Sequence, residues 1–160
     1  MKIYNIKMVF GALILIGVMN ACKKETATPT PTPTSSFGLL QTKILDKSCA
    51  LSGCHAATSD NAYKQHNLIL KGDNVYTALF NGSVKNADAI KANLKQIVAN
   101  DLENSFFYQK INFKNAKHKY GVSMPIGLND LTANQVKFIE QWIKAGAPKD
   151  GDVADKTLLD

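Results

Sequence analysis

The sequence contains no arginine, so each of its 19 basic residues is a lysine. Lysine lacks the planar fork with which arginine binds phosphates and base edges in a bidentate manner. The lysines also form no cluster interleaved with aromatic residues. The net charge of +6 therefore indicates a mildly basic, solvated surface, and we expect no nucleic-acid partner.

Motifs typical of hydrolytic enzymes are missing from the sequence too. It has no Gly-rich phosphate loop. Its serine, histidine and aspartate residues do not follow the order and turn context of a hydrolase triad. We therefore expect no hydrolytic enzyme.

The N-terminal apolar run, Met8–Val18, follows two lysines and is too short for an ordinary membrane-spanning helix. Both features are typical of a signal peptide. The run leads into Val18-Met19-Asn20-Ala21-Cys22, which resembles a bacterial lipobox. We therefore predict a lipoprotein signal peptide over residues 1–21 and lipidation of Cys22 as the first mature residue. Its acyl chains would anchor the protein in a membrane; an uncleaved N-terminal anchor is the alternative.

A segment of alternating threonine and proline follows the predicted lipidation site. Such a composition cannot bury apolar surface and favours an extended polyproline conformation. We therefore divide the mature chain into a lipidated cysteine with a disordered Thr/Pro linker, a folded domain and a polar tail, which are residues 22–36, 37–149 and 150–160.

Apolar residues in the folded domain recur at helical spacing, which predicts an all-α fold. Ser36 can cap the first helix, and Thr132 with Gln135 fits a capping box at the start of the last one. The short apolar run Leu68–Leu70 fits either a strand or the wall of a cavity. Helices are predicted from Phe37 to about Lys47, over 75–80, 87–99 and 105–111, and from Thr132 to Gly146. The predicted buried faces of the first and last helices are Leu39, Leu40, Ile44 and Leu45, and Val136, Ile139, Trp142 and Ile143.

Two cysteines and a histidine occur within seven residues, in Cys49-Ala50-Leu51-Ser52-Gly53-Cys54-His55. In a secreted protein this pattern is typical of c-type haem attachment, whose common form is C-x-x-C-H. Each thiol can add to a haem vinyl group to give a thioether, and the adjacent imidazole can bind the iron. We therefore predict one covalent haem c, attached through Cys49 and Cys54, with His55 as an axial ligand.

Four residues separate the two cysteines, instead of the usual two. On a regular α-helix, residues five positions apart are rotated by roughly 140°, so Ala50–Gly53 must loop out if both thiols are to meet one haem edge. Gly53 suits such a loop, because glycine adopts positive φ at little cost. A Cys49–Cys54 disulfide is the competing interpretation in an oxidising compartment. A zinc site at Cys49, Cys54 and His55 would lack an evident fourth ligand.

Met124 is the only methionine that remains once the signal peptide is removed. It lies before Pro125, which restricts the backbone of the residue preceding it, and its sulfur could bind iron opposite His55. A Met/His pair raises the reduction potential of a haem. Met124 as a filler of the core is the alternative, and His66 and His118 are the rival ligands. Both histidines lie in stretches typical of polar loops.

Three stretches carry a further pattern. They are Lys43–Cys49 leading into Cys54-His55, Glu103–Ile111, and Met124-Pro125 followed by Leu131-Thr132 and Gln141–Ala147. Together they resemble the small cytochrome c domain found in planctomycete and Bacteroidetes membrane lipoproteins. The resemblance covers about Phe37–Pro148 and implies an all-α cytochrome c fold around one covalent haem. It also implies His55 as the proximal ligand of iron and Met124 as the distal one.

These features together predict a lipid-anchored c-type cytochrome that transfers single electrons in the cell envelope. The residues Lys23-Lys24-Glu25 loosely resemble export signals of surface lipoproteins in Bacteroidetes, which favours the outer membrane, on its periplasmic or surface face. With both axial sites filled, we expect redox proteins as partners and no substrate chemistry at iron. One alternative is a haem-free surface lipoprotein in which a Cys49–Cys54 disulfide staples a partner-binding domain. The other is a peroxidase or gas sensor with an open distal site.

Overall fold

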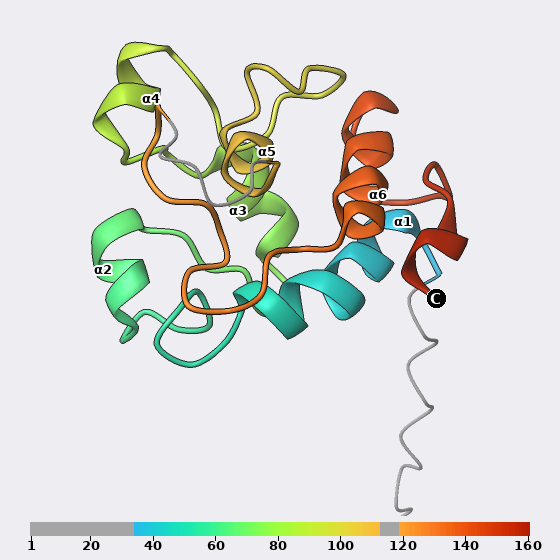
Figure 1. Cartoon of the computed structure of the whole chain (residues 1–160), viewed down its shortest axis with the longest axis horizontal. Coiled ribbons are helices and arrows are strands. Elements are labelled where there is room, and N and C mark those ends of the chain that lie inside the picture. The colour runs from blue at the N-terminus through green and yellow to red at the C-terminus, as the bar shows by residue number, and fades with distance from the viewer. Residues whose placement is uncertain (1–33, 113–118) are drawn as a thin grey trace, which may run out of the picture. The chain divides into compact units, whose positions relative to one another are not determined.

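The computed structural model describes residues 34–112 and 119–160, which belong to the unit Thr32–Asp160. Short helices joined by irregular segments make up this part of the chain (Figure 1). The described residues form no strand, which agrees with the predicted all-α class. The helices are α1 (Ser36–Leu39), η1 (Leu40–Cys49), α2 (Asn61–His66), α3 (Val75–Asn81), α4 (Ala87–Lys91), α5 (Phe106–Ile111), α6 (Ala133–Lys144) and η2 (Lys156–Leu159).

The predicted signal peptide, the lipidation site Cys22 and most of the predicted linker lie outside the described residues. Within 34–112 and 119–160, no helix is both long and apolar enough to cross a membrane. The predicted lipid anchor therefore stays a prediction.

Helix α6 begins at the predicted capping box. The Thr132 hydroxyl accepts a hydrogen bond from the Gln135 amide at 3.1 Å, and the Gln135 side chain accepts one from the Thr132 amide at 2.9 Å. Gly146 ends the helix with a φ of +92°, a conformation that glycine adopts without strain. Both ends of the helix thus follow from local sequence signals.

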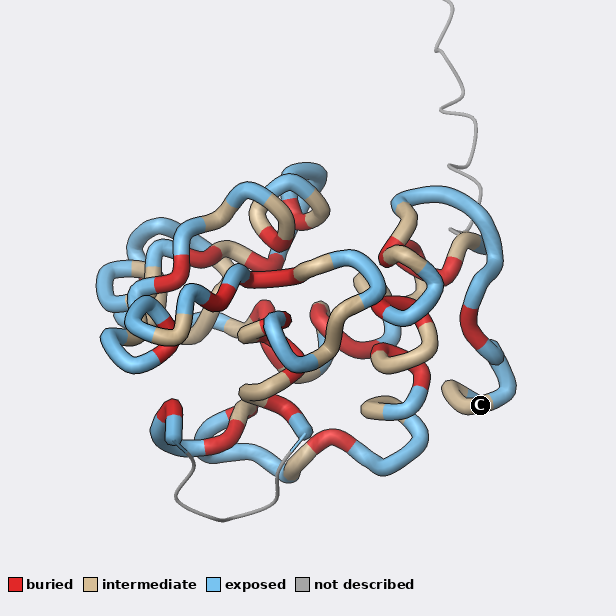
Figure 2. The backbone as a smooth tube through the Cα atoms, turned by 90° about the horizontal axis from the view of Figure 1, so that it is seen from above, coloured by how far each residue is buried: buried red, intermediate tan, exposed pale blue. Residues whose placement is uncertain are grey.

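One face of α6 forms the centre of the hydrophobic core, which the buried stretches in Figure 2 trace. Trp142 is fully buried, packs on Phe37 of α1 with ring centroids 5.8 Å apart, and donates from Nε1 to the Pro148 carbonyl at 2.9 Å. Val136 was predicted on this face but is only half-buried, and Phe138 takes a buried place instead. The fully buried residues of the helix are Phe138, Ile139, Trp142 and Ile143.

The first predicted helix changes its winding after one turn. From Leu40 it continues as the π-helical segment η1, and at its end the Ala50 amide donates to the Leu45 carbonyl, five residues back, at 2.7 Å. On an α-helix, residues nine positions apart are rotated by about 180°, which would place Leu40 and Cys49 on opposite faces. Bonds between residues five apart widen the turn. Leu40, Ile44 and Cys49 are accordingly all buried, and the helix delivers Cys49 to the interior.

The structure corrects the predicted cap of this helix. The side chain of Ser35 accepts the Gly38 amide at 3.1 Å, so Ser35 is the N-cap. Ser36 is buried, and its hydroxyl accepts hydrogen bonds from the amides of Val153 and Ala154 at 2.9 and 3.0 Å. The first helix and the C-terminal residues are thereby joined.

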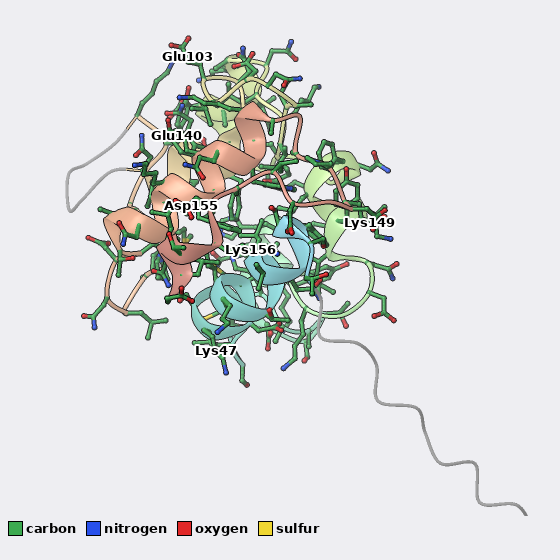
Figure 3. All side chains as sticks on the ribbon, turned by 90° about the vertical axis from the view of Figure 1, so that its right-hand side faces the viewer. Lys47, Glu103, Glu140, Lys149, Asp155 and Lys156 are labelled. Carbon is green, nitrogen blue, oxygen red and sulfur yellow. The ribbon has the colours of Figure 1, made fainter. Side chains whose placement is uncertain are left out.

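The expectation that residues 150–160 form a polar tail outside the folded domain is therefore wrong. The Asp155 amide donates to the Gln141 side chain of α6 at 2.8 Å, and Leu158 and Leu159 pack against the core. Asp155 and Lys156 lie close to α6, which carries Glu140 (Figure 3). The apolar pair near the C-terminus explains the packing, because burying leucine side chains is favourable.

The helix predicted over 87–99 is also wrong beyond its first turns. α4 ends at Lys91, and Asn93 has a φ of +56°, which a right-handed helix does not tolerate. Ile90 is 55% exposed, whereas Leu94 and Ile97 reach the interior from an irregular segment. Apolar spacing alone did not reveal this break. The helices predicted over 75–80 and 105–111 are confirmed as α3 and α5.

Candidate functional site

A cavity of about 420 Å³ lies against the end of η1 and the loop that follows it. Its volume falls within the range typical of small-molecule and cofactor pockets. The four residues that were predicted to hold haem, Cys49, Cys54, His55 and Met124, all line this one cavity. Most of its wall is apolar, with contributions from Leu68, Leu70, Phe107, Ile111, Pro125 and Ile126.

The two cysteines are brought together by a tight loop. The Cys54 amide donates to the Leu51 carbonyl at 2.9 Å, and the His55 amide donates back to the Cys49 carbonyl at 3.2 Å. Gly53 has a φ of +82°, so the predicted use of glycine in this loop is confirmed. Residues 50–53 thus loop out between the cysteines, as the longer spacing requires.

The His55 ring is oriented by a backbone carbonyl. Its Nδ1 lies 2.9 Å from the Leu68 oxygen, which can only accept, so Nδ1 carries the proton in this hydrogen bond. The Leu70 amide in turn donates to the His55 carbonyl at 2.8 Å. Nε2 is left as the nitrogen with a lone pair for a metal, an arrangement typical of metal-binding histidines. The run Leu68–Leu70 is not a strand, and two of its residues, Leu68 and Leu70, line the cavity.

Cys49 is held in an apolar setting. Burial raises the pKa of its thiol to about 12, and the nearby Cys54 adds to the effect. Cys49 is buried, whereas Cys54 is half-buried, and both are free thiols in the structure. The protonated form is the one that fits an apolar wall, because burial disfavours the thiolate.

Met124 reaches the cavity from the irregular segment before α6, and its peptide bond to Pro125 is cis. Its amide donates to the carbonyl of Lys110 on α5 at 2.8 Å. The Lys110 ammonium donates to the Tyr120 carbonyl at 3.2 Å and also to that of Val122. Lys110 therefore holds the backbone that leads into Met124.

His66 also lines the cavity, at the end of α2. Its ring centroid lies 6.4 Å from that of His55. Burial lowers the pKa of His66, and His55 and Lys110 lower it further. Because of its position in the cavity, His66 remains a rival to Met124 as a ligand of iron. His118, the other rival, lies outside the described residues.

Sequence reasoning missed Asp60, which ends the loop after His55. Its buried carboxylate accepts hydrogen bonds from the amides of Gly53, Ala56 and Ala57 at 3.0, 3.0 and 2.8 Å. The bonds from Gly53 and then Ala57 are the main reasons why the pKa of Asp60 lies below its ordinary value. An aspartate ahead of a short helix was a visible signal, but it points to a helix cap and not to this loop.

Comparisons of the chain with protein-family models, with curated proteins and with solved structures found no match. The site is therefore defined by its own geometry. Among the described residues, no three or more His, Cys, Asp or Glu side chains gather as a metal-binding cluster. Two thiols, an imidazole with its Nδ1 engaged and a thioether do share one apolar cavity, and this donor set suits a covalently attached haem.

Proposed function

We propose that the protein is a lipid-anchored c-type cytochrome that carries single electrons in the cell envelope. One observation carries the proposal: the side chains of Cys49, Cys54, His55 and Met124 line the same cavity. Their chemistry is that of two thioether attachments and two axial iron ligands. When bound, haem would supply an iron centre that takes up and releases one electron.

The chain's own residues would attach and orient this group. Addition of each cysteine S–H across a vinyl C=C bond joins sulfur to one carbon and hydrogen to the other, and it consumes no oxidant. The Leu68 carbonyl keeps the proton on His55 Nδ1 and so fixes the tautomer of the ring. Nε2 would then be free to bind the iron as the proximal ligand. The Met124 sulfur would fill the distal position and leave no open site for substrate chemistry.

The cavity walls would set the environment of the iron. Leu68, Leu70 and Phe107 are buried and exclude water from their side of the cavity. Burial of haem against apolar side chains would affect its reduction potential, and so would a Met/His ligand pair. These two features support electron transfer over peroxidase or gas-sensing activity.

Covalent attachment is tested by producing the full chain with a cytochrome c maturation system. The wild-type protein is expected to keep its haem stain after denaturation and to give a pyridine haemochrome of c type. Cys49→Ala and Cys54→Ala should each lose one thioether, and the double variant should lose covalent haem. A colourless wild-type protein with Cys49 and Cys54 joined as a disulfide would refute the proposal and favour the haem-free lipoprotein.

The membrane anchor is tested separately at Cys22. Mass spectrometry of the wild-type N-terminal peptide should show acyl chains on Cys22. Cys22→Ala should release the domain from membranes or leave an unprocessed precursor. A mature N-terminus at another residue would contradict lipidation but leave the haem proposal standing. Fractionation of outer and inner membranes then tests the proposed location, and protease shaving of intact cells tests the face.

A further inference from the structure

The Asp60 carboxylate binds the loop on both sides of the Cys54-His55 pair. Oδ1 accepts from the Gly53 amide at 3.0 Å, directly before the pair. Oδ2 accepts from the amides of Ala56 and Ala57 at 3.0 and 2.8 Å, directly after it. Only 9% of the surface of Asp60 is exposed.

These bonds complete a continuous set. Every amide from Gly53 to Ala57 donates a hydrogen bond, because those of Cys54 and His55 donate to the Leu51 and Cys49 carbonyls. Three of the five consecutive amides therefore depend on one side chain. Fixed amides fix the peptide planes, and the peptide planes fix where the side chains of Cys54 and His55 point.

An ordinary helix-capping role does not account for Asp60. It does occupy the N-cap position of α2 (Asn61–His66), with the extended backbone that a cap adopts. Its side chain, however, makes no capping hydrogen bond to that helix. All three of its bonds run backwards to the loop. The side chain thus serves the loop and not the helix.

The extra length of the loop explains why such a residue is needed. Cys49 ends η1, but Cys54 lies beyond the helix, so helical geometry cannot fix its position relative to Cys49. Gly53, next to Cys54, has the left-handed φ of +82° and no side chain with which to restrain itself. The hydrogen bond from Gly53 to Asp60 supplies that restraint.

We propose that Asp60 is the positioning residue that makes the four-residue cysteine spacing compatible with two thioether bonds to one haem. This inference rests on the proposed function and adds to it a residue outside the cysteine-histidine stretch. Asp60 touches neither haem nor iron in this role. It acts through the backbone of Gly53, Ala56 and Ala57, which sets the directions of the Cys54 thiol and the His55 imidazole.

The test compares Asp60→Asn with wild type in full chain made with the maturation system. The amide NH2 of asparagine replaces one acceptor oxygen, so donors meet donors at one end of the loop. Losing buried hydrogen bonds of this kind should raise the fraction of protein with an unattached Cys54 by about tenfold. An unattached cysteine leaves one vinyl group intact, which moves the pyridine haemochrome band to longer wavelength. Alkylation of the denatured protein should then label Cys54.

Two control variants separate positioning from other effects. Asp73→Asn makes the same chemical change at an exposed aspartate and should leave attachment unchanged. Thr132→Ala removes the α6 cap, so it lowers stability without touching the loop. If Thr132→Ala gave the same unattached cysteine, general destabilisation would explain the result and the positioning role would be refuted.

A second readout needs no haem. In chain made without the maturation system, the amides of Ala56 and Ala57 should exchange with deuterium at least about tenfold faster in Asp60→Asn than in Asp73→Asn. Unchanged exchange together with two thioethers in Asp60→Asn would overturn this inference and leave the proposed function intact. A wild-type protein that takes up no covalent haem would overturn both.

Discussion

The two sides of the cavity are held in different ways. On the cysteine side, the loop from Cys49 to Asp60 fixes itself, with five consecutive amides bonded inside it. On the methionine side, Val122 and Ile126 are 60% and 58% exposed, and the backbone around Met124 is held through Lys110 of α5. The cysteine side is held by contacts within its own loop, whereas the methionine side is held by contacts with another element, helix α5.

This difference suits the chemistry proposed for each side. Thioether bonds are permanent, so their partners must be placed before the haem arrives. An axial thioether contact can form and break, so a segment held by side chains of neighbouring elements, Lys110 and Asn86, is sufficient. The predictions below test this contrast, from the largest expected effect to the smallest.

The largest effect is expected from matched truncations of two isoleucines. Ile44 is fully buried in η1, the helix that ends at Cys49, whereas Ile126, two residues after Met124, is 58% exposed. Ile44→Ala should lower the free energy of unfolding by about 2–5 kcal/mol, the cost typical of a buried isoleucine. Ile126→Ala should change it by no more than about 0.5 kcal/mol. Urea denaturation of the two variants, in the same haem state, measures both changes in the free energy of unfolding. Equal destabilisation by the two substitutions would contradict the difference between the two sides of the cavity.

The next effect concerns the thiols of reduced, haem-free chain carrying Cys22→Ser. Because burial raises the pKa of Cys49 to about 12, its reactive thiolate is scarce near pH 8. Iodoacetamide should therefore alkylate Cys54 at least about tenfold faster than Cys49, since each pKa unit changes the thiolate fraction tenfold. Peptide mapping at short times gives the two rates. In denaturant the rates should converge, and a Cys49 that reacts first in the folded chain would contradict the burial of this side.

Local signals made part of this molecule predictable. The α6 capping box could be predicted because Thr132 and Gln135 bind each other's backbone amides within one turn. The loop at Gly53 was predicted from the cysteine spacing, the requirement that both thiols meet one haem edge, and the glycine itself. The C-terminal packing was not predictable, because Ser36 contacts Val153 and Ala154, which are more than 100 residues away in the sequence. No local sequence pattern indicates such a contact.

The same distinction applies to the site. The cavity-lining residues Cys49, Cys54, His55 and Met124 were chosen for their chemistry, and the structure brings them together. Their role toward haem stays a prediction. The contacts that orient them were missed, because the partners of His55 and Met124 are backbone groups, which every residue carries. Chemistry can be read from residue types, whereas orientation comes from the fold.

A smaller effect is expected at Met124 itself. In haem-loaded protein, Met124→Ala should keep both thioethers, because the cysteine side does not depend on it. Loss of the sulfur ligand should lower the reduction potential by on the order of 100 mV, within the wide range that axial ligands set. The variant should also bind carbon monoxide in the reduced state and lose the far-red band of ferric sulfur ligation.

His66→Ala is the companion variant for this prediction. His66 lines the same cavity, so it tests the rival ligand directly. It should leave the far-red band and the potential near their wild-type values. If His66→Ala changes the spectrum and Met124→Ala does not, the site has two histidine ligands. Wild-type protein that already binds carbon monoxide readily would instead indicate an open distal position.

The smallest effect is expected from Lys110→Met, which removes the ammonium but keeps the length of the side chain. The segment ahead of Met124 would lose the ammonium's bonds to the Tyr120 and Val122 carbonyls. The bond from the Met124 amide to the Lys110 carbonyl would remain, as would the one from the Asn86 side chain to the Tyr120 carbonyl. The sulfur should therefore leave the iron more often without being lost. Carbon monoxide binding to reduced protein should become faster than in wild type but slower than in Met124→Ala, as stopped-flow measurements would show.

Lys85→Met provides the matched control, because Lys85 also lines the cavity and loses the same charge. Charge removal near haem would shift the potential in both lysine variants alike. Lys110→Met should speed carbon monoxide binding and Lys85→Met should not, since the Lys110 ammonium is bonded to the backbone that leads into Met124. If the two variants bind carbon monoxide equally fast, the lysine acts through its charge alone, and the methionine side does not depend on the bonds of the Lys110 ammonium.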